Sequence, residues 1–293
     1  CWGGTPFPIP KTGYEAMWNH QLMFSEPMEM VFGAYLANAR GAISLLQVSH
    51  AVTDFPYYDP ERKPYEGGGA YSLRLLTAGL EPARDVGNQS LIMYPLHFDA
   101  EDQRAWSYQP GQRRVRLAPE FSYDTPVPLY GGTMFFDESN MFAGRMDRFN
   151  FELKGRQLMY MPYNNYRLHM LRGDPEQILG PNHYKPEVVR YELRRVWVVE
   201  ATPLPGARHM AKKKRFYLDE DSWLILAYEG WDHSDKLFRL LVSNVVSNYW
   251  RGGIALGNSK QIYDLSRGQY SATQTPLCEG CYIRYGITPP SDA

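Results

Sequence analysis

The side chains that most often carry chemistry are scattered along this chain of 293 residues. Helical metal or catalytic sites pair histidines four residues apart, as in H-E-x-x-H, and no predicted helix holds such a pair. His169 and His183 lie near polar loops and would meet only through the fold. The full set is His20, His50, His97, His169, His183, His209 and His233. Isolated histidines are typical of ordinary core or surface positions, so they indicate no site by themselves.

Two charged runs could also serve a function. Asp219–Ser222 reads DEDS, and three carboxylates could bind calcium or act in acid–base chemistry. The run lacks the glycine and the spaced oxygens of a calcium loop, so we expect a solvated hairpin turn. Lys212–Arg215 reads KKKR and could contact anionic lipid head groups or an acidic partner. It is more typical of a solvated loop that enters a strand.

The cysteines offer a third possibility. Cys278 and Cys281 form a C-x-x-C motif, and Cys1 opens the chain. A zinc site needs about four ligands, and no second motif of this kind accompanies the first. A thioredoxin-like motif would open a helix, whereas PLCEGCYIRYG predicts a turn and a strand. We therefore expect either a local disulfide between Cys278 and Cys281 or two ordinary thiols, and no metal.

Motifs of the common enzyme classes are absent. The chain contains no G-x-S-x-G, no phosphate-binding G-x-x-x-x-G-K-[ST] and no dinucleotide-binding G-x-G-x-x-G. The glycine run at Gly67–Gly69 lies in a Pro- and Gly-rich loop with no helix start behind it. The sequence thus predicts no catalytic residues and no cofactor, and a hydrolase is the least favoured function.

An arginine-rich stretch, AWSYQPGQRRVRLAP, raises the question of nucleic-acid binding. The chain carries 31 basic and 32 acidic side chains, a net charge of −1, whereas a nucleic-acid footprint needs a surplus of cations. QPGQ is a turn sequence, and Trp106 and Tyr108 share one face of the strand before it. Alternation after the turn places Arg114 and Arg116 on one solvated face. We expect a hairpin and no nucleic-acid partner.

The elements that position these residues are mostly strands. The chain has 22 Tyr, 13 Phe, 22 Pro and 25 Gly, a composition that favours strands and turns. One short helix is predicted over 11–24, because Thr12 and Glu15 form a capping box. A pair of strands broken at PYNN is predicted over 149–171, a short helix after Asp174, and a long strand over 188–204. No apolar run is long enough for a transmembrane helix, and no linker divides the chain, so one domain over 1–293 is expected.

The clearest pattern is a three-stranded meander over 214–245. Its middle and last strands are apolar at both parities, as Leu224 and Leu226 beside Ile225 illustrate. An antiparallel sheet with one wet face alternates instead. We therefore expect both faces to be covered, one by helices and loops, the other by a packed core or an apolar ligand.

Several blocks of the sequence resemble one bacterial family. They are GGTPFPIPKTGYEAMWNH, YQPGQRRVRLAP, YMPYNNYRLH, VVRYELRRVWVVEAT, GARHMAKKKRFYLDEDSW and LFRL, which follow in order from Gly3 to about Val245. The chain is identified by them as a member of the domain of unknown function 1329 family, labelled outer membrane lipoprotein-sorting protein-like. That family resembles the periplasmic lipoprotein carriers LolA and LolB.

The resemblance implies a mainly β, α+β fold: a curved antiparallel sheet that forms an unclosed half-barrel, with short helices covering its concave face. Carriers of this type hold acyl chains between sheet and helices. The resemblance also implies a periplasmic location in a Gram-negative envelope, and partners such as an inner-membrane exporter of lipids or hydrophobic molecules, or an outer-membrane protein.

Two features depart from the family pattern. Members usually have a signal peptide and a longer segment before the GGTPFPIPK block, so we expect this chain to lack the N-terminal part of a longer precursor. Cys1 is for the same reason not expected to carry a lipid. The segment that contains Cys278 and Cys281 matches no family block.

The favoured function is a carrier that binds a lipid or another hydrophobic ligand without covalent chemistry and passes it to membrane partners. The alternative is a ligand-free structural or docking module of an envelope transport complex, whose concave face is filled by its own aromatic side chains. For a carrier, the candidate cavity-lining residues are Trp106, Tyr108, Tyr160, Trp197, Leu224, Leu226, Phe238 and Leu240.

Overall fold

A single antiparallel sheet runs through the computed structural model, which describes residues 4–58, 71–97, 99–117, 124–171, 174–251, 254–275 and 277–288. The order of strands across the sheet is β6-β5-β4-β3-β2-β1-β13-β12-β11-β10-β9-β8-β7, and β14 pairs with β1 beside β13. From β1 to β6 and from β7 to β13, consecutive strands pair with each other, whereas β13 and β14 pair with β1 at the other end of the chain. The sheet consists of two meanders joined along β1 and β13.

The first meander holds β1 (Met28–Ala37), β2 (Ile43–Asp54), β3 (Tyr71–Glu81), β4 (Gln89–Pro95), β5 (Arg104–Gln109) and β6 (Arg114–Leu117). The second holds β7 (Phe149–Pro162), β8 (Tyr191–Pro203), β9 (Lys213–Asp219), β10 (Ile225–Trp231), β11 (Leu237–Asn248), β12 (Ile254–Asp264) and β13 (Gln269–Thr275), and β14 (Tyr282–Tyr285) follows. The predicted hairpin at β5 and β6, the long strand β8 and the meander from β9 to β11 are confirmed.

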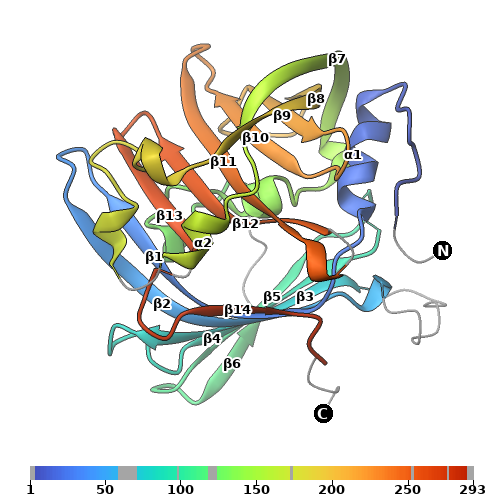
Figure 1. The fold of residues 1–293 in the computed structure, drawn as a ribbon. Coiled ribbons are helices and arrows are strands. Elements are labelled where there is room, and N and C mark those ends of the chain that lie inside the picture. The colour runs from blue at the N-terminus through green and yellow to red at the C-terminus, as the bar shows by residue number, and fades with distance from the viewer. Residues whose placement is uncertain are drawn as a thin grey trace.

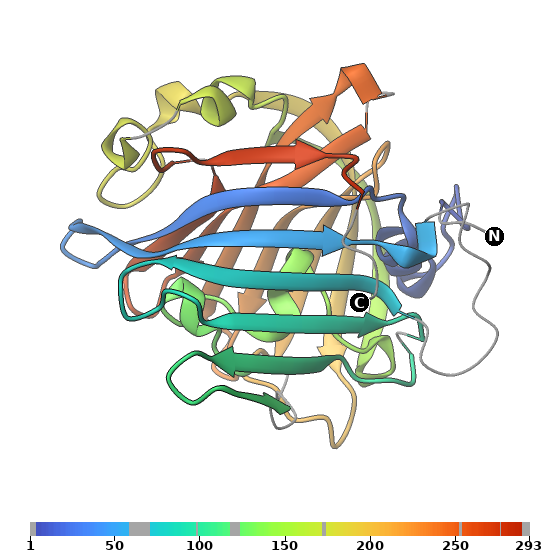
Figure 2. The same cartoon turned by 90° about the horizontal axis from the view of Figure 1, so that it is seen from below.

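The sheet curves strongly but does not close. Strands β6 and β7 are its two edges, and no pairing joins them within the described residues. Figure 1 shows β1 to β6 as the lower wall and β7 to β11 as the upper wall of an open half-barrel, and Figure 2 shows the first meander from outside. The predicted fold class is therefore confirmed.

Helix α1 (Gly13–Leu22) lies against the inner face of β7 and β8. It begins as predicted: Thr12 Oγ1 accepts from the Glu15 amide, and Glu15 accepts from the Lys11 amide. The Tyr14 hydroxyl donates to the Phe149 carbonyl at 2.6 Å. A Cβ on Gly13 would lie 2.6 Å from the Phe151 carbonyl, so glycine permits this close approach.

A second inner layer is the segment 124–148, called the plug here, which connects the two edge strands. It contains the 3₁₀ turns η2 (Pro128–Tyr130), η3 (Phe136–Met141) and η4 (Met146–Arg148). Its apolar side chains Val127, Tyr130, Met134, Phe136, Met141, Phe142 and Met146 pack with the inner faces of β7 to β12. The η1 turn (Pro56–Tyr58) and the η7 turn (Tyr249–Arg251) lie near strand ends.

The outer face of β1, β12 and β13 is covered as well. Helix α2 (Tyr166–Met170), η5 (Pro175–Gln177) and η6 (Pro186–Val188) follow β7. Leu168, Ile178 and Leu179 pack there against Tyr35 and Tyr270. The prediction of a second strand after PYNN is wrong, because this segment turns away from the sheet and covers its outside. The short helix capped by Asp174 is confirmed, since its carboxylate accepts from the Glu176 amide.

Register shifts decide which side chains face inward. A shift between Ile225 and Ala227 places Ile225 and Tyr228 in the same inner cluster, which strict alternation would forbid. Leu226 accordingly faces the outer cluster with Val196 and Val198. Both faces of this meander are buried, as the two-sided apolar pattern predicts.

A candidate binding cavity in the half-barrel

The inner faces of the two meanders are filled to different extents. Over β7 to β10 the space is packed by the molecule's own aromatic rings, with Phe142 in edge contact with Phe149, Phe151 and Phe216. Over β1 to β5 the sheet and the plug enclose a cavity of about 430 Å³. That volume falls within the range of about 300–1,000 Å³ typical of ligand pockets.

Most of the lining is apolar or carries only hydroxyl groups. The first meander contributes Phe32 on β1, Leu75 on β3 and Ile92 on β4, and the plug contributes Leu129 and Phe136. Strands β1 to β5 bring no charged side chain to the lining. This wall can bury hydrocarbon at about 25 cal/mol per Å² of apolar surface.

The opposite wall is more polar. Strands β11, β12 and β13 place Ser243, Lys260 and Thr273 side by side, because Ser243 pairs with Lys260 and Lys260 pairs with Thr273 in register. Lys260 is buried, with 5% of its surface exposed. Burial lowers the pKa of its ammonium to about 8.

His20, at the end of α1, lies beside this polar wall. Its Nδ1 is 3.0 Å from the Trp223 carbonyl oxygen and its Nε2 is 3.1 Å from the Asn140 carbonyl oxygen. Burial lowers the pKa of His20 to about 4, although both hydrogen bonds favour the protonated ring, and Lys260 lowers it further. The ring is therefore neutral near pH 7, where it can donate to one of the two carbonyls at a time, and it lies between the plug and the turn that joins β9 to β10.

One carboxylate belongs to the lining. Glu26 Oε2 lies 2.6 Å from Arg251 Nε, and Glu26 is buried whereas Arg251 is half-exposed. The ion pair joins the segment after α1 to the turn η7. It leaves Lys260 as the one charged lining residue without an ion-pair partner among the described residues.

A buried charge network holds the plug on the sheet. Asp137 of η3 pairs with Lys214 of β9 and with His209, whose Nε2 lies 3.1 Å from the carboxylate. Its neighbour Glu138 lies 3.6 Å from Arg239 of β11. Burial raises the pKa of Glu138, and Lys214 and His209 lower the pKa of Asp137 despite its burial. Lys214 is thus not part of a solvated run, because its buried ammonium pairs with the Asp137 carboxylate of the plug.

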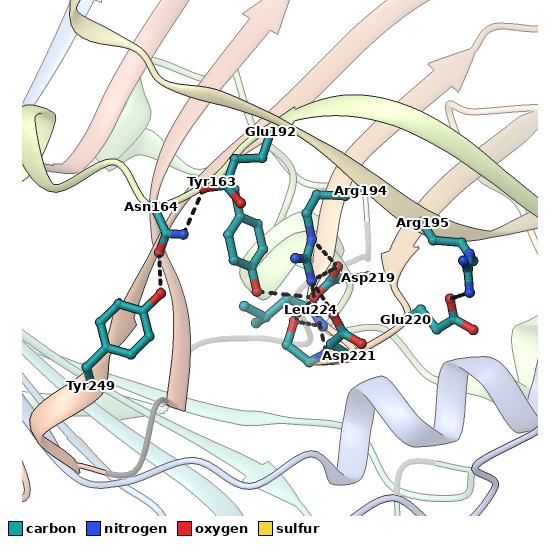
Figure 3. A network of polar contacts seen from close by, with 11 residues as sticks. Tyr163, Asn164, Glu192, Arg194, Arg195, Asp219, Glu220, Asp221, Leu224 and Tyr249 are labelled. Atoms are coloured by element: carbon teal, nitrogen blue, oxygen red, sulfur yellow. Dashed lines mark hydrogen bonds and ion pairs between the residues drawn. The ribbon is translucent and has the colours of Figure 1, made fainter.

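On the outer face, the acidic turn also departs from the expectation of full solvation. Figure 3 shows Arg194 of β8 above Asp219, with the Tyr163 hydroxyl and Asp221 beside it. Arg194 Nη2 lies 2.9 Å from Asp219 Oδ1, and the buried Asp219 also accepts from the backbone and side chain of Ser222. Asp221 remains exposed. The turn is structural because Asp219 closes it from within.

The structure brings two of the eight predicted lining residues to the cavity, namely Trp106 and Leu224. Trp197 is buried in the filled part, stacked on Trp223, and Leu226 and Phe238 belong to other buried clusters. Tyr108 and Leu240 are half-buried outside the lining. Tyr160 is exposed near the end of β7.

These six residues lie outside the lining of this cavity, and the reason is geometric. The cavity lies against β1 to β5, whereas most candidates were taken from the second meander. In the second meander, bulges shift the alternation of side chains and further segments bury the outer face. Alternation in the sequence therefore does not show which of these residues face the cavity. His20, Glu26 and Lys260 were missed, since each has ordinary neighbours in sequence and acquires its surroundings from distant strands.

Cys278 and Cys281 are bonded to each other, with their Cα atoms 5.2 Å apart. Both are buried beside Val48 and precede β14. The bond closes the turn that brings β14 to β1.

The open curved sheet, the inner helix and plug, and the cavity between them define a LolA-like half-barrel. The family model described as "Protein of unknown function (DUF1329)" matches residues 1–289, and the chain belongs to that family. The uncharacterized protein PA3922 of Pseudomonas aeruginosa is 33% identical over 271 residues. This match covers 91% of the chain and 58% of the relative, so the chain spans less than two thirds of that protein.

Solved structures share the fold at low identity. A DUF1329 family protein from Desulfovibrio piger gives a TM-score of 0.62 at 14% identity, covering 95% of this chain and 93% of that one. A putative outer membrane lipoprotein-sorting protein domain from Vibrio parahaemolyticus gives 0.62 at 13%, covering 96% and 94%. The LolA superfamily protein NE2245 from Nitrosomonas europaea gives 0.51 at 10%, covering 96% of both chains.

Proposed function

We propose that this chain is a periplasmic carrier that holds a lipid or another hydrophobic molecule in the cavity and delivers it to a membrane partner. The partner is an exporter of lipids or hydrophobic molecules in the inner membrane, or an outer-membrane protein. Holding is non-covalent, and no bond of the cargo is made or broken.

The cavity carries this proposal. A docking module has no use for unfilled apolar volume, and empty space in a core is costly because its lining loses contacts. Here the molecule's own rings pack the space over the second meander, whereas over the first meander aromatic, aliphatic and hydroxyl side chains surround an unfilled volume of about 430 Å³. The names of the Vibrio and Nitrosomonas neighbours support a place in lipoprotein sorting or a related envelope pathway. No helix of the described residues is long and apolar enough to cross a membrane.

The first test is native mass spectrometry of the chain secreted into a Gram-negative periplasm, followed by organic extraction and lipid analysis. A stoichiometric extra mass that extraction removes, together with a matching lipid, supports the carrier. A clean apo mass that persists after incubation with fatty acids and phospholipids overturns it and favours the docking module.

A matched pair of variants locates the binding. Ile92 lines the cavity, whereas its neighbour Leu91 on the same strand is not part of the lining. We expect Ile92→Trp to fill the space and abolish the extra mass, and Leu91→Trp to retain it. Equal retention by both variants would place the lipid elsewhere on the molecule.

A further inference from the structure

Lys260 is the one strongly polar group in the cavity that nothing in the described residues neutralises. Its side chain projects from β12 into the inner space between Ser243 and Thr273. The described residues place no carboxylate and no hydrogen-bond acceptor on its ammonium. An isolated buried cation is costly, and proteins normally pair it.

The other buried cations of the inner face follow that rule. Lys214 pairs with Asp137, and Arg239 lies 3.6 Å from Glu138 and 3.7 Å from Asp264. The pairs with Asp137 and Glu138 fasten the plug to the sheet, and the pair with Asp264 links β11 to β12. Lys260 is equally buried yet fastens nothing, and it faces open volume instead of the plug's carboxylates.

The neighbouring groups do not supply the missing charge. His20 is uncharged, and Ser243 donates its hydroxyl to the Ile225 carbonyl at 3.1 Å. Glu26 is engaged by Arg251. Across the cavity from Lys260, the first meander offers only uncharged side chains. The cavity is therefore amphipathic, with one cationic point opposite an apolar wall.

We infer that Lys260 binds the anionic head group of an amphiphile, a carboxylate or a phosphate monoester, whose hydrocarbon chain lies along β1 to β5. This inference rests on the proposed function, because it names the cargo class of that cavity. An anionic head group at Lys260 supplies the negative counter-charge that the described side chains do not provide. A charged hydrogen bond formed away from water is among the stronger polar contacts.

The test compares amphiphiles that share one tail. Dodecanoate, dodecyl phosphate and dodecanol are titrated calorimetrically into wild-type protein stripped of lipid, at pH 7 and low micellar content. We expect at least one anion to bind about tenfold or more tightly than dodecanol. Of dodecanoate and dodecyl phosphate, the compound that binds more tightly identifies carboxylate or phosphate as the preferred head group.

Lys260→Met removes the charge and keeps the length of the side chain. We expect it to lose the preference for the anion and to retain dodecanol binding, which also shows that the variant is folded. Lys236→Met removes the same charge from the exposed turn between β10 and β11 and should behave like the wild type. A preference that survives in Lys260→Met, or equal binding of all three compounds by the wild type, overturns the inference while the carrier stands. Failure of all three to bind wild type overturns the carrier as well.

The pH dependence gives a second readout. The preference should fall as the pH rises through about 8 and above, because Lys260 loses its proton there. His20 on α1 is already neutral, and burial raises the pKa of Tyr94 on β4 to about 12 and raises the pKa of Tyr130 on η2. A preference that stays constant to pH 10 contradicts the role of Lys260.

Discussion

His20 and Trp223 are 203 residues apart in sequence, yet Nδ1 of the His20 ring lies 3.0 Å from the Trp223 carbonyl oxygen. This contact joins the first helix to the turn between β9 and β10. It depends on a buried ring that stays neutral near pH 7, since burial lowers its pKa to about 4.

Acid should therefore weaken the fold through His20. Between pH 6.5 and about 4 the unfolded chain binds a proton that the folded chain refuses, so stability falls as the pH falls, by at most about 1.4 kcal/mol per pH unit. We expect His20→Gln to show a shallower loss than the wild type in urea titrations at stepped pH. His97→Gln, at an exposed position, should follow the wild-type curve. Parallel curves for all three proteins would contradict the assignment.

Lys260→Met should stabilise the protein. The folded-state pKa of about 8 lies below the ordinary value of 10.5, so the charged form is penalised in the fold and stability rises between these two pH values. At pH 7 the variant avoids that penalty, on the order of 3 kcal/mol. Chemical denaturation at pH 7 and pH 10 should show the gain shrinking at the higher pH. A variant less stable than wild type at pH 7 would show that Lys260 has a partner in the fold.

The buried pair of Asp137 and Lys214 should behave in the opposite way. Lys214→Met leaves the Asp137 carboxylate without its main counter-charge, and we expect a loss of about 3–5 kcal/mol. Adding Asp137→Leu should recover part of that loss, because no charge then remains buried. A double-mutant cycle measured by denaturation tests this, and simple additivity would show that the pair does not couple.

The acidic turn offers a sharp internal contrast. Asp219→Asn removes the charge that holds Arg194, Ser222 and Tyr163, and should cost about 3 kcal/mol. Asp221→Asn, two residues away and 76% exposed, should change stability by less than about 0.5 kcal/mol. Thermal unfolding of the two variants beside wild type decides the point, and similar losses would refute the buried role of Asp219.

Local patterns predicted much of this fold. The capping box at Thr12 and Glu15, the hairpin at Trp106 and the meander around Leu224 depend on near neighbours in sequence, and all three form as expected. The family blocks added the curvature and the inner helices, which no periodicity reveals.

The site could not be predicted in the same way. Lys260 is preceded and followed by ordinary strand residues. The residues around its side chain, Ser243, Thr273 and His20, belong to other elements and bring no negative charge. Asp137 and Lys214 are 77 residues apart, so nothing local marks either as buried. Parity failed at Leu226, because a one-residue bulge reverses every side chain beyond it.

The joint between β1 and β13 has a consequence for the order of assembly during synthesis. Within each meander the strands pair with sequence neighbours, and such contacts can form early. The joint instead brings Ala37 of β1 against Tyr270 of β13, and β14 adds the pair of Met28 with Tyr285, so both contacts wait for the last part of the chain. We therefore expect the two walls to exist before the space between them does, and the binding chamber to be completed only when the final strands arrive.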